Sequence, residues 1–250
     1  MNFNMTFGDI LNHGFVRKFA ELNQHEIPMG IQMTLIIAAV LVTLVASYLL
    51  GSLNFAIIIS GRQYKQDIRN FGSKNAGMTN MMRTYGKKAA GLTLLGDALK
   101  AVAAAIIGYA LLGQLGAYIA GVFCILGHMF PAFYKFKGGK GVVTTAVSIL
   151  MCNPIVFLIL ITIFVIIVAF TKYISLGSVM CVLLYPLILD RIERLLNPSG
   201  GSAFTIFAVL VAVLVVFKHR ENIKRLLNHT ESKFSFKKSV KTPDQEADKK

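Results

Sequence analysis

The chain has 250 residues, of which 55% are hydrophobic and only 15% are charged, and its mean hydropathy is +0.62. This composition excludes an ordinary soluble domain, which would carry about a quarter charged residues. The long apolar blocks favour an all-α, polytopic membrane protein over a β-barrel, whose strands alternate. The formal net charge of +14 comes from Lys and Arg beside those blocks, so no nucleic-acid partner is expected.

In chain order, residues 1–32 mix polar and apolar side chains and are expected to form an accessory N-terminal extension. The first membrane span is predicted at about 33–59 and is followed by a basic loop at 62–88. Further full spans are predicted at about 89–112, 115–133, 155–170, 173–189 and 204–217.

Residues 141–152 form an unusually short apolar segment. About twelve helical residues cover roughly 18 Å, which is less than the thickness of the hydrocarbon core. Asn153-Pro154 should end this helix, because proline removes a donor and disfavours helix in the preceding residue. The segment predicts a short fourth helix that turns back into the fifth; one long helix kinked at Pro154 is the alternative.

The distribution of charge predicts the orientation of the chain. The loops at 62–88 and 134–140, Lys172 and the C-terminal tail are basic, so the positive-inside bias places them in the cytoplasm. Seven spans with the N-terminus outside satisfy this bias, whereas six would leave Lys172 or the tail outside. The membrane domain is therefore predicted at 33–228, and the charged tail at 229–250 is expected to be disordered.

The loop from residue 72 to residue 83 is rich in groups that bind phosphate. It has few apolar residues to pack, and its arginine could grip a phosphate through two hydrogen bonds. The alternative is a solvated loop that only sets the topology. The candidate ligands are Ser73, Asn75, Gly77, Thr79, Asn80 and Arg83.

A second candidate, Gly138-Gly139-Lys140-Gly141, opens the short fourth helix on the basic side. Glycines allow backbone N–H groups to approach an anion, and a helix N-terminus adds a positive dipole. The sequence is not a Walker A loop, because Gly141 stands where Ser or Thr would follow the lysine. A flexible turn with a topology lysine is the alternative.

Polar residues at the ends of the later spans complete the candidate set. Ser175 begins the sixth span and could cap its helix or bind a phosphate. His219 and Asn222 lie three residues apart where the seventh span ends, so they face the same direction.

Several other charged residues have simpler interpretations. Asp67 and Arg69 could form an ion pair that orients the loop after them. Asp97 and Lys100, three apart inside the second span, are expected to neutralise each other, since unpaired charges at that depth are costly; a role in supporting the site is the alternative. His128, at the end of the third span, is expected to be a hydrogen-bonded structural group, with a catalytic role as the alternative.

Other chemistries lack their signatures. There is no Gly-x-Ser-x-Gly elbow, no His followed by Asp five positions later, and no acidic cluster for catalytic Mg²⁺. No metal and no cofactor are therefore expected.

At these residues the chain resembles the bacterial acyl-phosphate:glycerol-3-phosphate acyltransferases, the PlsY family. The resemblance covers about 45–231. The motifs that carry it are Gly51-Ser52, Asp67-Ile68-Arg69 through Arg83, Gly127-His128 with Pro131, 136–144, Ser175-Leu176 with Ser178, and 219–226.

The resemblance implies a seven-helix fold in the bacterial plasma membrane, with the site at the cytoplasmic face. It implies transfer of an acyl group from acyl phosphate to the 1-hydroxyl of glycerol 3-phosphate, which yields lysophosphatidic acid and phosphate. By motif position it assigns the active site to Ser73, Arg83, Lys140, Ser175, His219 and Asn222, with Asn75, Thr79 and Gly139 beside them.

This chain departs from the family pattern at Lys74, Met78, Ala101 and His229, and the last change leaves the role of Glu231 open. The proton of the attacking hydroxyl could pass to His219 or to the substrate's own phosphate. Two alternatives to this activity are a transporter for a phosphate-bearing solute and a transferase that uses acyl-CoA. The oligomeric state cannot be read from the sequence.

Overall fold

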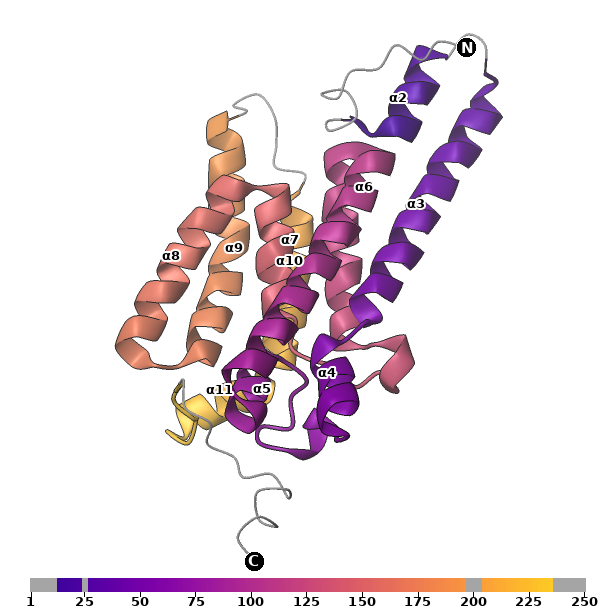
Figure 1. The fold of residues 1–250 in the computed structure, drawn as a ribbon. Coiled ribbons are helices and arrows are strands. Elements are labelled where there is room, and N and C mark those ends of the chain that lie inside the picture. The colour runs from indigo at the N-terminus through magenta and orange to yellow at the C-terminus, as the bar shows by residue number, and fades with distance from the viewer. Residues whose placement is uncertain (1–12, 24–26, 197–203, 236–250) are drawn as a thin grey trace, which may run out of the picture.

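The computed structural model describes residues 13–23, 27–196 and 204–235, and every regular element in these ranges is helical. The helices are α2 (Phe15–Leu22), α3 (Met29–Ser52), α4 (Phe55–Tyr64), α5 (Met78–Tyr85), α6 (Lys87–Met129), α7 (Val142–Cys152), α8 (Pro154–Thr171), α9 (Ile174–Leu196), α10 (Thr205–Lys218) and α11 (Arg220–Leu227). Figure 1 shows the long helices side by side, with α2 at one end and α5 and α11 at the other.

Four stretches have the length and apolar composition to cross a membrane, namely Met29–Tyr64, Lys87–Tyr134, Pro154–Thr171 and Ile174–Leu196, while α7 and α10 are shorter apolar helices. Large apolar side chains on α8 point outward, including Leu158 at 60% and Phe170 at 86% exposure. Outward apolar faces of this kind suit lipid rather than water. The prediction of an all-α membrane protein is confirmed.

The second and third predicted spans form one continuous element, α6, which bends sharply at Gly113. This glycine has φ 63° and ψ −148°, a conformation that side-chain-bearing residues avoid. The two halves then run close together, because Gly108 and Gly116 face each other without intervening side chains. The break lies where the sequence predicts the turn between the two spans.

The first predicted span is divided near its C-terminal end. α3 ends at Ser52, and α4 starts after Asn54, whose side-chain oxygen accepts the N–H of Ile57 at 3.2 Å and caps the new helix. The amide nitrogen of Asn54 also donates to the carbonyl of Ala76 at 3.3 Å. The same residue therefore starts α4 and fastens it to the loop before α5.

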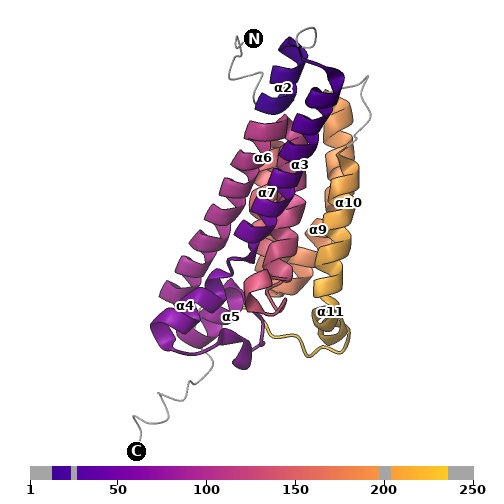
Figure 2. The same ribbon diagram turned by 90° about the vertical axis from the view of Figure 1, so that its right-hand side faces the viewer.

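The short fourth helix does turn back, as one of the two interpretations predicts. α7 ends at Cys152, and Asn153 caps α8 by accepting the N–H of Val156 at 3.1 Å, with Pro154 at the first helical position. In Figures 1 and 2 the α5–α11 end gathers α4, α5 and α11. We call this the basic end, because the loops and helix ends there carry Arg62, Lys74, Lys87, Lys88, Lys135, Lys137 and Lys224.

Helix α2 lies in the N-terminal extension and packs on α6 and α3 at the opposite end. Gly14 precedes it and sits directly on the backbone of Leu112 and Gly113, where no side chain would fit. The extension expected at 1–32 therefore includes an ordered helix, and α3 already begins at Met29.

Candidate active site

A cavity of about 1070 Å³ lies at the basic end and reaches inward between the helices. Its mouth is polar, and its inner part is apolar. All six residues assigned by motif position line it: Ser73, Arg83, Lys140, Ser175, His219 and Asn222. The apolar part is lined by Val142, Val143 and Val147 of α7 and by Phe157, Leu160, Phe164 and Val168 of α8.

The first wall is the loop before α5. Asn80 holds this loop together: its Oδ1 accepts the N–H of Ser73 at 3.0 Å, and its Nδ2 lies 2.9 Å from Phe71 O and 3.0 Å from Asn75 O. The side chain of Asn80 is buried, and these hydrogen bonds within the loop use both ends of its amide, so Asn80 shapes the loop. Asn80 also lines the cavity, and its direct binding of phosphate stays a prediction.

The loop and α5 bring several other predicted residues to the cavity. Asn75, Gly77 and Thr79 line it, and Arg83 reaches it from the last turn of α5. The Arg83 guanidinium donates to the carbonyl of Ser232 at 3.3 Å. Burial lowers the pKa of Arg83 and nearby Glu231 opposes that change, but a guanidinium remains charged at any physiological pH.

The second wall is the turn that leads into α7. Lys140 and Gly141 line the cavity, and the Lys140 ammonium donates to Oδ1 of Asn222. Burial, the largest cause, lowers the pKa of Lys140 to about 8 together with the charges of Arg225 and Arg83, whereas Glu231 raises it.

The other two glycines of this turn behave differently from the prediction. The N–H of Gly138 donates to Met129 O at 3.3 Å, and the N–H of Gly139 donates to His128 O at 3.1 Å. These bonds satisfy carbonyls at the end of α6, so the two N–H groups cannot also converge on an anion. The binding of phosphate by Gly138 and Gly139 stays a prediction that these N–H groups do not support, and of the three glycines only Gly141 lines the cavity.

The third wall comes from the junction of α10 and α11. His219 is buried, and its Nδ1 lies 2.8 Å from the carbonyl of Val215. A carbonyl only accepts, so Nδ1 carries the hydrogen and Nε2 keeps a free lone pair. Burial lowers the pKa of His219 to about 4, which keeps the imidazole neutral near pH 7.

Glu231 joins these walls, and the sequence did not assign it a role. Its Oε1 accepts from Ser175 Oγ at 2.7 Å and from Asn222 Nδ2 at 2.6 Å, and its Oε2 accepts from Arg225 Nε at 2.8 Å. Burial alone would raise the pKa of Glu231, but these hydrogen bonds outweigh it and lower the pKa. Glu231 thus contacts the site from beyond the boundary predicted at 228, and residues 236–250 of the predicted tail lie outside the described residues.

The Ser175 hydroxyl therefore donates its hydrogen bond to Glu231. Among the described residues it makes no hydrogen bond that caps α9. Arg225 is the other site residue that the sequence did not identify. Its position one helical turn after Asn222 on α11 was the available signal, since residues three apart share a face.

The ion pair expected between Asp67 and Arg69 is present, with Arg69 Nη2 2.7 Å from Asp67 Oδ2. Arg69 Nη1 also donates to Tyr134 O and Lys137 O, both at 2.9 Å. The pair therefore ties the first wall to the turn that precedes Lys140.

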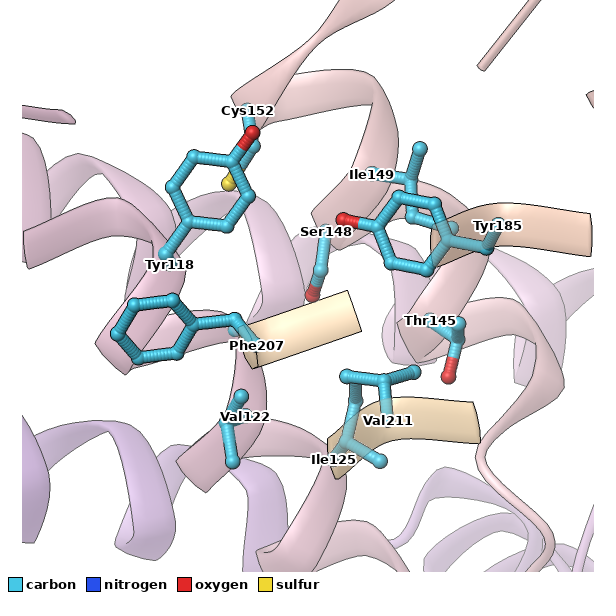
Figure 3. Close-up of a pocket in the computed structure, with 11 residues that line it drawn as sticks. Tyr118, Val122, Ile125, Thr145, Ser148, Ile149, Cys152, Tyr185, Phe207 and Val211 are labelled. Carbon is cyan, nitrogen blue, oxygen red and sulfur yellow. The ribbon is translucent and has the colours of Figure 1, made fainter. Parts of the chain in front are cut away.

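A second cavity of about 10 Å³ lies deeper in the bundle, between α6, α7, α9 and α10 (Figure 3). Tyr118, Thr145 and Ser148 line it, and their buried hydroxyls have no hydrogen-bond partner in the described part of the chain. Its volume suits about one water molecule, and no charged side chain lines it. The large cavity is therefore the candidate active site.

Comparison with known proteins gives one consistent result. The family model described as glycerol-3-phosphate acyltransferase matches residues 41–229. A glycerol-3-phosphate acyltransferase from Finegoldia magna is 41% identical over 192 residues, which is 76% of this chain and 93% of that protein. One from Syntrophomonas wolfei is 44% identical over 194 residues, covering 78% and 96% of the two chains.

A solved structure agrees with the sequence relatives. The glycerol 3-phosphate form of PlsY, described as an integral membrane glycerol 3-phosphate acyltransferase, superposes with a TM-score of 0.70 at 33% identity. The alignment covers 78% of this chain and 96% of that one. The lysophosphatidic acid form of PlsY gives a TM-score of 0.68.

Proposed function

The chain belongs to the glycerol-3-phosphate acyltransferase family, and on that premise we propose that it moves an acyl group from acyl phosphate to the 1-hydroxyl of glycerol 3-phosphate. It is a membrane acyltransferase, and this excludes the alternative interpretation as a transporter. The products would be lysophosphatidic acid and inorganic phosphate. The acyl phosphate donor, the roles of the individual residues and the orientation in the membrane are parts of this proposal.

The observation that carries the proposal is the division of one cavity into a cationic mouth and an apolar interior. Arg83, Lys140 and Arg225 line the mouth and suit two phosphate groups, while α7 and α8 supply apolar side chains for an acyl chain. A site of this kind can bring a lipid-soluble donor and a water-soluble acceptor together at the membrane boundary.

Acyl phosphate is an activated donor, so the transfer needs no nucleophile from the protein. The hydroxyl oxygen of glycerol 3-phosphate attacks the acyl carbonyl carbon, the bond from that carbon to the phosphate oxygen breaks, and phosphate leaves with the bonding electrons. Arg83 and Lys140 would stabilise the charge on the departing phosphate and align the reactants.

His219 would act on the acceptor hydroxyl. Its imidazole is neutral and its Nε2 lone pair is free, so it can accept a hydrogen bond or the hydroxyl proton. The substrate's own phosphate remains the alternative proton acceptor. Asn222 would help to orient the acceptor, because it contacts both Lys140 and Glu231.

The test uses the protein purified in detergent. Phosphate release from acyl phosphate should require glycerol 3-phosphate, and lysophosphatidic acid should form in equal amount. Replacing the donor with acyl-CoA or acyl carrier protein should abolish product formation. Comparable rates with acyl-CoA would overturn the assignment of the donor while leaving the enzyme an acyltransferase.

A further inference from the structure

Three charged or titratable side chains of α6 meet at the wall of the cavity, which Asp97 and His128 line, at a depth where such groups are rarely found. Asp97, Lys100 and His128 are 2%, 4% and 4% exposed. Lys100 Nζ lies 2.8 Å from Asp97 Oδ1 and 2.9 Å from His128 Nδ1. It also donates to the carbonyls of Gly51 at 3.0 Å and Leu53 at 2.8 Å, at the end of α3.

The contacts of Lys100 define the state of His128. An ammonium group can only donate, so Nδ1 of His128 accepts and the ring hydrogen is on Nε2. Four acceptors already surround the ammonium, which therefore has no hydrogen left for a substrate. Buried charges of this kind are costly and tend to persist where they determine local geometry.

His128 contacts the turn before Lys140 through both its backbone and its ring. Its carbonyl accepts the N–H of Gly139. Its ring lies so close to Gly139 that a Cβ there would overlap Nε2, and the same Cβ would be 2.5 Å from the carbonyl oxygen of Ala76. Ala76 is fully buried in the loop that carries Ser73. The two walls of the cavity thus meet at Gly139, against His128.

We propose that Asp97, Lys100 and His128 are positioning residues for acyl transfer. Lys100 and Asp97 fix the ring of His128, and the ring sets how closely Gly139 approaches Ala76. That approach determines the separation between Lys140 and the loop that carries Ser73. The inference rests on the proposed function, since Lys140 is taken to act on phosphate.

The test is a double-mutant cycle between His128→Asn and Gly139→Ala. The asparagine Oδ1 can still accept from Lys100, but the part of the ring that packs against Gly139 is lost. Gly139→Ala changes none of the three cluster residues, but its Cβ presses on the His128 ring and on the carbonyl of Ala76 and so forces the two walls apart. Gly91→Ala is the matched control, because a Cβ at that exposed α6 glycine meets nothing within 4 Å.

Each single variant should lower kcat by about 100-fold, the loss expected for a displacement near 1 Å, with a smaller change in KM for glycerol 3-phosphate. The detergent melting temperature should stay near that of the parent. The double variant should lose far less than the product of the two single losses, because both substitutions act on one contact.

Near-native kcat in Gly139→Ala would overturn the inference, as would independent effects of the two substitutions. A lower melting temperature with unchanged kcat per folded molecule would show a purely structural role and would also overturn it. If His128→Asn does not fold, the inference is tested by comparing the kcat of Gly139→Ala with that of the control, Gly91→Ala. If the parent protein uses a donor other than acyl phosphate, the kcat of each variant relative to the parent is measured with that donor. The assignment of the donor and the positioning role of the cluster can therefore fail separately.

Discussion

Lys140 is the residue on which the proposed chemistry depends most. It is partly buried, faces the cavity and lies near the other cations of the mouth. Lys140→Ala should lower kcat by about 100-fold or more, the usual loss when one donor to a developing anion is removed. The measurement is phosphate release with both substrates at saturation.

The control for this substitution is Lys137→Ala. Lys137 lies in the same turn, but its side chain is exposed and does not line the cavity. It should retain nearly full activity. Equal losses in the two variants would show that total positive charge, and not the placement of Lys140, is what matters.

Lys140 should also determine how the activity depends on pH. Because burial lowers the pKa of Lys140 to about 8, the ammonium form predominates below that pH and is lost progressively above it. We expect kcat/KM to be level near pH 7 and to fall about tenfold per unit well above pH 8. Lys140→Arg should remove this alkaline decline, since arginine stays charged; a decline that persists unchanged in that variant would contradict the assignment.

His219 should add no decline on the acidic side near neutral pH. Its pKa is lowered to about 4, so the imidazole is already neutral near pH 7 and above. A second decline centred near pH 6 would therefore belong to the phosphate of the substrate, whose second ionisation lies near that value.

At the scale of elements, the segment at 229–235 is the least expected part of the site. Glu231 bonds to α9 and α11, and Phe234 N–H donates to Lys172 O at 2.7 Å in the turn between α8 and α9. The segment therefore connects elements that approach the cavity from different sides.

Two truncations should separate this segment from the residues beyond it. A chain that ends at residue 235 should keep full activity, because all the described contacts of the tail remain. A chain that ends at residue 228 should lose at least about tenfold in activity, since charged hydrogen bonds to Ser175, Asn222 and Arg225 disappear. Activity assays and melting curves in detergent measure both effects. Equal activity of the two chains would show that Glu231 is dispensable.

At the scale of the whole molecule, the two ends of the bundle differ in what they contain. The basic end holds the cavity, and the opposite end holds α2 and the end of α9. If the basic end is cytoplasmic, glycerol 3-phosphate reaches the mouth from water while the donor enters from the membrane.

Labelling of single cysteines should test this orientation. Lys224→Cys on α11 should react with a membrane-impermeant reagent only in inside-out vesicles, and Arg191→Cys near the end of α9 only in intact cells. Both side chains are exposed. The background is a Cys181→Ala chain, because Cys124 and Cys152 are buried whereas Cys181 is half-buried and lines the cavity. The reverse pattern of labelling would invert the proposed topology.

Much of this protein could be predicted from local sequence. The length of the apolar blocks identifies membrane helices, because lipid requires each helix to satisfy its own backbone hydrogen bonds. The turn at Gly113, the reversal at Asn153-Pro154 and the ion pairs of Asp67 and Asp97 follow from short-range chemistry, and all are confirmed. The family and its reaction follow from several motifs in the right order.

Only the tertiary structure decided which polar groups are available to a substrate. Asn80, Gly138 and Gly139 have the right chemistry, but their hydrogen bonds are used by the loop and by the end of α6. Glu231 carries a charge opposite to the one expected in an anion site, and yet it organises Ser175 and Asn222. Each buried donor or acceptor must find a partner, and that partner is often far away in the chain. Local sequence therefore reveals which groups can bind phosphate, whereas packing determines which of them remain free to do so.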